Sequence, residues 1–322
     1  MATGSLTENN LIHPREGTYF TVLLVFSCLL WLCCVFFILA LPFVALTVWC
    51  IHGLLIARLR SESVRITPEQ YPELHATFVE VCQKLQLAVV PELYVLQSGG
   101  FLNAFATRFT GRNFVVIYSS LEEILGASGP MMKFLMGHEI GHIQRKHLIK
   151  KMVLIPGLIV PLLYQAYHRA CESTCDRYGA YASDDLNGSM QALTVLASGR
   201  TAARVDTGHF AVQHFHARGF FVSWHELAST YPTLSQRVAQ ILGFQDPQYA
   251  ARPERHPLAY PCAFLFNIRN IFLAYLAFIV LMTLGASASG VQKAIAEQQR
   301  QMLLLQQQQQ QQQAPETPPA TK

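Results

Sequence analysis

Charged side chains are scarce in this sequence. Only 14% of its 322 residues are Asp, Glu, Lys or Arg, whereas an ordinary soluble domain has about 25%, and 51% are hydrophobic. The mean hydropathy is positive. The composition therefore excludes an ordinary soluble protein and predicts membrane segments. The net charge of +4 is too small and too dispersed to indicate nucleic acid, so a basic surface that faces a membrane is the simpler interpretation.

A disulfide framework is also lacking. The sequence has eight cysteines, and four of them lie within one apolar run: Cys28, Cys33, Cys34 and Cys50. The other four do not have the spacing of a disulfide scaffold. This usage is typical of a reducing compartment.

The longest apolar run, residues 19–56, contains no Asp, Glu, Lys or Arg. As one helix its 38 residues would be about 57 Å long, against a hydrocarbon core of about 30 Å. The run is therefore predicted to be a transmembrane hairpin (residues 19–57) that turns near residues 39–42 and follows an N-terminal segment (1–18). A single tilted span that continues as an amphipathic helix is the alternative.

The remaining chain is expected to divide into three parts. Residues 58–262 form the main domain, 263–289 a C-terminal membrane segment, and 290–322 a disordered tail rich in Gln and Pro. Arg58, Arg60 and Arg65 follow the apolar run. By the positive-inside rule, they place the main domain in the cytoplasm.

An H-E-x-x-H motif stands at His138, Glu139 and His142. Residues four apart lie on one face of a helix, so both imidazoles can bind one zinc ion while Glu139 acts as general base on the metal-bound water. Residues 128–130 (Ser-Gly-Pro) predict a cap and a proline in the first turn of that helix. Gly141 inside the helix indicates a close approach of backbone or substrate. A buried helix with two hydrogen-bonded histidines is the alternative.

A third ligand has to come from further along the chain. His147 does not fit, because on a continuous helix it would point away from the ligand face. Glu172 is the best candidate, and Asp176 lies one turn later, where its carboxylate can fix the tautomer of a ligand histidine. Alternatively, both carboxylates belong to a solvated helix face and pair with Arg169 and Arg177.

Two features near Glu172 bear on this assignment. Cys171 and Cys175 suggest a rival site with thiolate ligands, but no second cysteine pair completes it, and we interpret them as small, buried, reduced residues. The apolar stretch 152–167 lies between His142 and Glu172, and a single membrane crossing there would separate the two ligands. A hydrophobic insertion is predicted instead, either re-entrant or surface-lying, or a buried helical hairpin.

Between the apolar run and the motif, the sequence predicts a small α+β unit. A helix is expected from about residue 67 to 85, because Thr67 and Gln70 have the spacing of a capping box. Strands are expected at residues 92–98, 102–109 and 113–118, in a small antiparallel sheet. The fold class is thus α+β and mostly helical, with additional transmembrane helices. A strand that carries Asn103 beside the motif helix could bind an extended substrate by edge addition.

Together these features resemble the HtpX and CAAX-prenyl-protease family of membrane zinc peptidases. The resemblance covers residues 65–242 and rests on the following positions: 138–142, Glu172, Asp176 and Arg177, Asn103, Ala104, Phe105 and Ala106, Tyr231 and Pro232, and Arg237. It implies a gluzincin-like domain with one zinc ion per chain. Tyr231 stands where the family has histidine, although a tyrosine hydroxyl can also donate a hydrogen bond to an oxyanion.

The function expected is a membrane-anchored zinc metalloendopeptidase that cleaves membrane or membrane-associated proteins for quality control or processing. The expected zinc ligands are His138, His142 and Glu172, the catalytic residues Glu139 and Tyr231, the supporting residues Asp176 and Arg237, and the substrate-binding residues Asn103, Ala104 and Phe105. The alternatives are a catalytically silent membrane scaffold and a CAAX-type C-terminal processing protease. The partners expected are a peptide or protein substrate and a lipid bilayer. The expected location is the bacterial inner membrane, with several crossings.

Overall fold

The structure is a computed structural model. It describes residues 11–33, 41–97, 99–155, 157, 160, 162–251, 253–266, 275 and 300. The chain divides into two units, Met1–Asn267 and Ile268–Lys322. Only two residues of the second unit are described, so the tail and most of the predicted C-terminal membrane segment lie outside the described residues.

Two helices cover the described parts of the N-terminal apolar run, α1 (Glu16–Cys33) and α2 (Leu41–Glu62). In the described part of the chain, one helix, Pro42–Glu62, is long and apolar enough to cross a membrane. Its second half packs on the domain, since Ile56 and Leu59 are buried with Tyr94 and Phe114. Residues 39 and 40 of the turn predicted near residues 39–42 lie outside the described residues, and α2 begins at Leu41.

A four-stranded sheet forms the β part of the domain. Its strands are β1 (Val64–Arg65), β2 (Glu92–Leu96), β3 (Ala104–Phe109) and β4 (Arg112–Tyr118), in the order β1-β2-β4-β3. β3 and β4 form an antiparallel hairpin, but β4 lies parallel to β2, with Leu93 opposite Val115. The prediction of an antiparallel sheet is therefore wrong in part, because the chain after β2 passes to the sheet edge before it returns as β4. Strand composition alone does not distinguish the two pairings.

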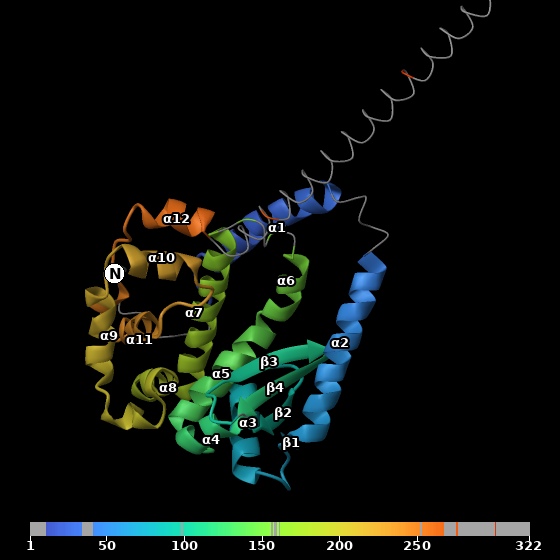
Figure 1. Ribbon diagram of the computed structural model, residues 1–322. Coiled ribbons are helices and arrows are strands. Elements are labelled where there is room, and N and C mark those ends of the chain that lie inside the picture. The colour runs from blue at the N-terminus through green and yellow to red at the C-terminus, as the bar shows by residue number, and fades with distance from the viewer. Residues whose placement is uncertain are drawn as a thin grey trace, which may run out of the picture. The chain divides into compact units, whose positions relative to one another are not determined.

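Helices account for most of the described residues. They are α3 (Pro72–Lys84), α4 (Ser119–Leu125), α5 (Pro130–Gln144), α6 (His147–Val153), α7 (Leu163–Ser183), α8 (Leu186–Ser198), η4 (Gly199–Arg204), α9 (Thr207–His216), α10 (Phe220–Ala228), α11 (Leu234–Leu242), η5 (Pro247–Ala250) and α12 (Ala259–Leu265). In Figure 1, α2 lies along one face of the sheet and α3 along the other. Successive side chains of β4 point to opposite faces of the sheet. Val115 therefore packs in the core with α3 and α5, whereas Val116 packs with α2.

Two predicted helix starts differ in detail from the observed ones. The Thr67 hydroxyl accepts from the backbone of Gln70 at 3.2 Å, as in a capping box, but the Gln70 side chain donates to the carbonyl of Arg65 instead. Thr67 and Gln70 also exchange backbone hydrogen bonds of 2.9 and 3.1 Å, and α3 begins only at Pro72. Pro130 does occupy the first turn of α5, but the capping residue is Gly129. The Ser128 hydroxyl instead donates to the carboxylate of Glu73.

Helices α5 and α7 run side by side at very close range (Figure 1). A Cβ atom added at Gly137 would lie 2.6 Å from the Cβ of Ala182, and one at Gly141 would lie 3.2 Å from the Cα of Cys175. Small residues at these positions let the two backbones approach. The close approach indicated by Gly141 is therefore that of α7, and it brings the two histidines of α5 near Glu172.

The apolar stretch 152–167 joins α6 to α7. Leu154 and Tyr167 are buried with Leu23 of α1, as in a hydrophobic core, whereas Met152 and Ile155 are exposed. The two prolines of the stretch lie outside the described residues.

Candidate metal centre

Three side chains converge where α5 packs on α7, two of them buried and that of His142 partly buried. His138 and His142 come from α5 and Glu172 comes from α7. The Nε2 atom of His138 lies 3.3 Å from Oε2 of Glu172, and that of His142 lies 3.6 Å from Oε1. The ligand atoms of the three residues all lie within 4.8 Å of one another. The predicted ligands thus meet at one point.

The donor set fits zinc. Two imidazole nitrogens and one carboxylate are the protein ligands of many catalytic zinc sites, with a further position left for water or substrate. Burial would raise the pKa of Glu172, but His142 and His138 lower it to about 2, so the ligand carboxylate stays ionised. Burial lowers the pKa of His142 to about 3 and keeps its imidazole neutral, as a metal ligand must be.

The carboxylate of Asp176 and the guanidinium of Arg237 lie on the side of His138 that faces away from Glu172. Oδ1 of Asp176 lies 2.9 Å from Nδ1 of His138. Arg237 of α11 donates to both oxygens of Asp176, from Nε at 2.8 Å and from Nη2 at 2.6 Å. Burial opposes the charge on Asp176, but Arg237 and His138 keep the pKa of this carboxyl below its usual range. Burial opposes a charge on His138, but its hydrogen bonds to Asp176 and Glu172 raise the pKa of this imidazole to about 10. Asp176 is placed to accept a hydrogen bond from Nδ1–H of His138, and a metal at Nε2 would take the place of the second proton.

Glu139 lies in the cavity with both histidines. Its side chain is buried, with 6% exposure, on the same helix as both histidines. Burial raises its pKa to about 7, although the charge of His138 and the backbone of Ala106 act in the opposite direction. A carboxyl group at this place is of the kind that can accept a proton and return it.

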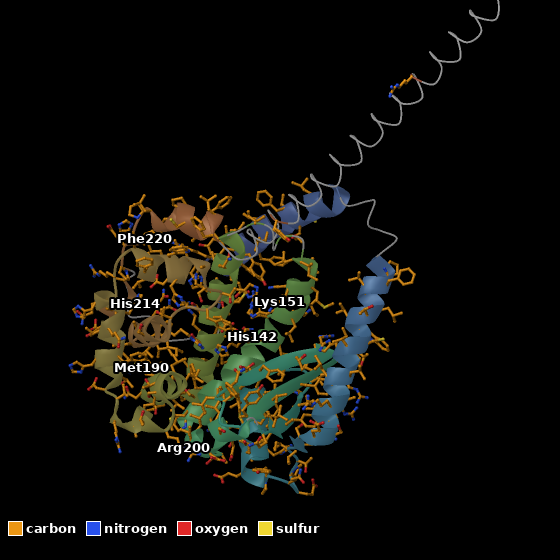
Figure 2. The ribbon with its side chains drawn as sticks, in the orientation of Figure 1. His142, Lys151, Met190, Arg200, His214 and Phe220 are labelled. Carbon is orange, nitrogen blue, oxygen red and sulfur yellow. The ribbon has the colours of Figure 1, made fainter. Side chains whose placement is uncertain are left out.

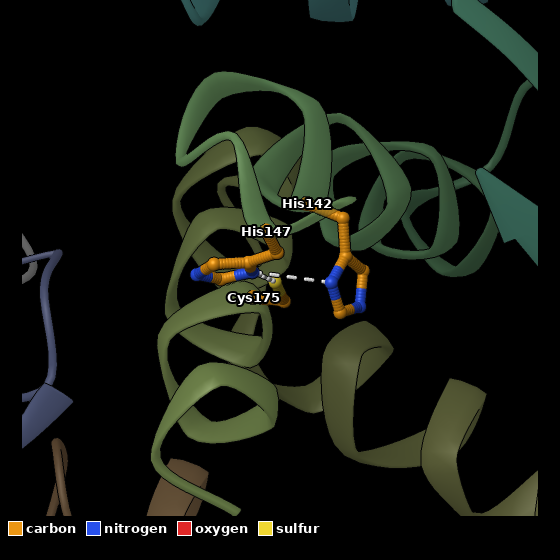
Figure 3. Close-up of side chains that lie close together, drawn as sticks. All are labelled: His142, His147 and Cys175. Atoms are coloured by element: carbon orange, nitrogen blue, oxygen red, sulfur yellow. Dashed lines mark hydrogen bonds between the residues drawn. The ribbon is translucent and has the colours of Figure 1, made fainter. Parts of the chain in front are cut away.

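His147 lies where the sequence did not predict it. The helix carrying the motif ends at Gln144, Lys146 adopts a left-handed backbone with φ of 54°, and His147 begins α6. Its Nδ1 atom lies 3.2 Å from Nδ1 of His142 and 3.7 Å from Sγ of Cys175. Figure 3 shows the three side chains together. The assumption of one continuous helix is wrong, and His147 contacts His142 through the nitrogen that does not face Glu172.

Two other groups of metal-binding residue types lie behind the first, in the described part of the chain. They are His142 with His147 and Cys175, and Glu16 with His147 and Cys171. Burial raises the pKa of both thiols, that of Cys175 well above its ordinary value. The group with Glu172 is the better metal site, because all three of its residues line the same cavity as Glu139.

The site opens into a cavity of about 530 Å³. His138, Glu139, His142 and Glu172 line it, together with Asn103, Ala104, Phe105, Lys151 and Tyr231. Figure 2 shows the side chains of His142 and Lys151. The cavity therefore collects the predicted ligands, base and substrate-binding residues, whereas Asp176 lies behind the ligands.

Strand β3 forms one wall of this cavity. It is the last strand of the sheet, so within the described residues its outer edge carries no strand. Asn103 precedes it, and its side-chain oxygen accepts from the backbone of Ala104 at 3.0 Å, while its carbonyl accepts from Tyr118 at 3.0 Å. Asn103 thus fixes the start of the edge strand.

Tyr231 lies at the rim of the cavity, with 58% of the residue exposed. It belongs to the loop between α10 and α11, which Arg169 holds through hydrogen bonds to the carbonyls of Leu227 and Ser229. The negative charge of Glu172, followed by partial burial, raises the pKa of Tyr231. Its hydroxyl therefore remains protonated and able to donate.

Comparison with known families gives one match. The family model of Peptidase family M48 matches residues 68–166. The matched segment contains α3, strands β2 to β4 and the whole of α5, and it ends in α7 before Glu172. Neither the curated proteins nor the solved structures gave a match.

Proposed function

We propose that this zinc-dependent peptidase is a membrane-anchored endopeptidase acting on membrane or membrane-associated proteins. Its residues 68–166 match Peptidase family M48, a family of zinc metalloproteases. One observation carries the proposal. The Nε2 atoms of His138 and His142 face the two oxygens of Glu172 in the cavity that Glu139 also lines.

Each residue has a separate task in peptide hydrolysis. His138, His142 and Glu172 would hold a zinc ion, whose Lewis-acid chemistry would lower the pKa of water and polarise the scissile carbonyl. Glu139 accepts the proton of the attacking water and then delivers it to the leaving amine.

Substrate is proposed to bind as an added strand along β3. The outer edge of this strand lines the cavity through Ala104 and Phe105, so an extended peptide paired with it would pass beside Glu139. Asn103 keeps the first residues of the strand in place. Tyr231, on the opposite loop, is proposed to donate its hydroxyl to the developing oxyanion.

Membrane anchoring is supported by exposed apolar surface. The exposed residues include Val25, Phe26 and Leu29 on α1, and Phe43, Val44 and Leu46 on the first half of α2. Large apolar side chains in such numbers favour a lipid environment. We propose a multi-pass protein of the bacterial inner membrane, with the catalytic domain in the cytoplasm.

Replacing the base tests the proposed function directly. Glu139→Gln should keep about one zinc ion per chain but lose peptide hydrolysis by at least about 10²-fold, because an amide cannot accept the proton. Metal analysis and cleavage of an unfolded protein substrate by the full chain in detergent provide the measurements. Glu123→Gln, at an exposed surface ion pair, is the matched control and should behave as wild type. Near wild-type turnover in Glu139→Gln would contradict the mechanism.

A further inference from the structure

Each ring nitrogen of His142 faces a different partner. Nε2 faces Glu172 at 3.6 Å, and Nδ1 faces Nδ1 of His147 at 3.2 Å. A hydrogen bond between two ring nitrogens needs one donor and one acceptor. If Nε2 of His142 is to offer its lone pair to a metal, its proton sits on Nδ1, and Nδ1 of His147 must be the acceptor.

The proton of His147 then has to sit on Nε2, and the structure provides an acceptor there. Oε1 of Glu16 lies 3.2 Å from Nε2 of His147. Glu16 is fully buried, and its other oxygen accepts from the hydroxyl of Thr174 at 2.6 Å. Arg145 and Lys150 lie 3.2 and 3.6 Å from Oε1 and compensate the negative charge.

We propose that Glu16 and His147 are positioning residues for the metal centre: Glu16 orients His147, and His147 holds His142 in the tautomer that binds the metal. The proposal rests on the proposed metal site. It makes the N-terminal segment part of that site, since Glu16 is the first residue of α1 and lies 131 residues from His147. The segment is fixed onto α7 by a hydrogen bond of 3.0 Å from the backbone of His13 to Thr174.

One neighbour competes for the same acceptor. Sγ of Cys175 lies 3.7 Å from Nδ1 of His147. A thiol is a weak donor, whereas a ring N–H is a strong one, so His142 is the better partner for His147.

Two substitutions of His147 separate positioning from packing. Asn places its carbonyl oxygen near the site of Nδ1 and can still accept from His142, whereas Gln places its amide near Nε2 and keeps only the contact with Glu16. His147→Gln should weaken zinc binding by about 10- to 100-fold, the usual effect of losing a partner behind a ligand, and His147→Asn should stay within about threefold of wild type. If His147 only fills space, the larger Gln is the milder change and the order reverses.

The measurement is zinc affinity of the full chain in detergent, by competition with a chelator, together with the visible spectrum of the cobalt-substituted protein. His225→Gln, an exposed histidine on α10, is the control. Glu16→Gln, which keeps an acceptor but removes the charge, should fall between the two His147 variants and provides a second test if His147→Gln does not fold.

Three outcomes would overturn the proposal. Equal affinities for His147→Asn and His147→Gln, or the reversed order, would remove the positioning role and leave the proposed function intact. A thiolate-to-cobalt absorption band that disappears in Cys175→Ala would assign the metal to the group of His142, His147 and Cys175 instead. A wild-type chain that binds no zinc would overturn the proposed function and the positioning role together.

Discussion

The two histidines of the candidate metal centre are supported in different ways. His138 contacts a carboxylate directly, that of Asp176, which comes from the same helix as Glu172. His142 reaches a carboxylate only through a second imidazole, and that carboxylate, Glu16, comes from the N-terminal segment. The same requirement, a fixed tautomer, is thus met once by neighbouring elements of the peptidase domain and once by a distant part of the chain.

The difference has a consequence for stability. The support of His138 includes Arg237, which is buried and bonded to both oxygens of Asp176. The cations near Glu16, which supports His142 through His147, are closer to solvent. The side chains of Arg145 and Lys150 are about a quarter exposed. We therefore expect the loss of a charge behind His138 to lower the free energy of unfolding more than the loss of a charge behind His142.

Removing the ligand that both histidines share should have the largest effect on the metal. Glu172→Ala should abolish stoichiometric zinc binding, because both Nε2 atoms lose the carboxylate that completes the site. Metal analysis after dialysis checks this. Unchanged zinc content would remove Glu172 from the site, and the comparison between its two sides would lose its basis.

Removing the buried cation should mainly affect folding. Arg237→Ala should lower the free energy of unfolding by about 3–5 kcal/mol near pH 7, because it leaves Asp176 buried without its charge partner. The ionised form of Asp176 is favoured in the folded state, so its contribution is present above the unfolded pKa of about 3.9 and is lost as the pH falls below it. The difference between variant and wild type should therefore shrink towards pH 3.

Denaturant unfolding at several pH values provides this measurement. Lys150→Ala on the other side of the site is the matched control and should cost much less, because water can reach its position. Equal losses in the two variants would mean that the two supports do not differ in the expected way.

The smallest effect is expected at the rim, where neither support is touched. Tyr231→Phe should leave zinc content and stability unchanged and lower kcat by about 10²-fold, as for the loss of one oxyanion donor. Steady-state kinetics with a peptide substrate check this. Tyr260→Phe, on α12, is a control with similar exposure. Wild-type kinetics in Tyr231→Phe would assign the residue to packing of the loop.

Local spacing predicted more of this site than of the surrounding fold. The i, i+4 spacing places His138 and His142 on one face of α5, and the same spacing places Glu172 and Asp176 on one face of α7. The strands were found nearly at their predicted positions, but the parallel pairing of β2 with β4 was not predicted, because it depends on the path of the chain between them. The catalytic and binding roles of these residues stay predictions.

The sequence by itself determined the chemistry of the candidate site, because a helix repeats its side-chain directions every few residues and a motif of five residues therefore has a defined geometry. Only the tertiary structure decided what lies behind that site. The contacts of Glu16 with His147 and of Arg237 with Asp176 join residues 131 and 61 positions apart. Such contacts follow from the close packing of α5 on α7 and from the bend at Lys146, and neither leaves a periodic signal in the chain.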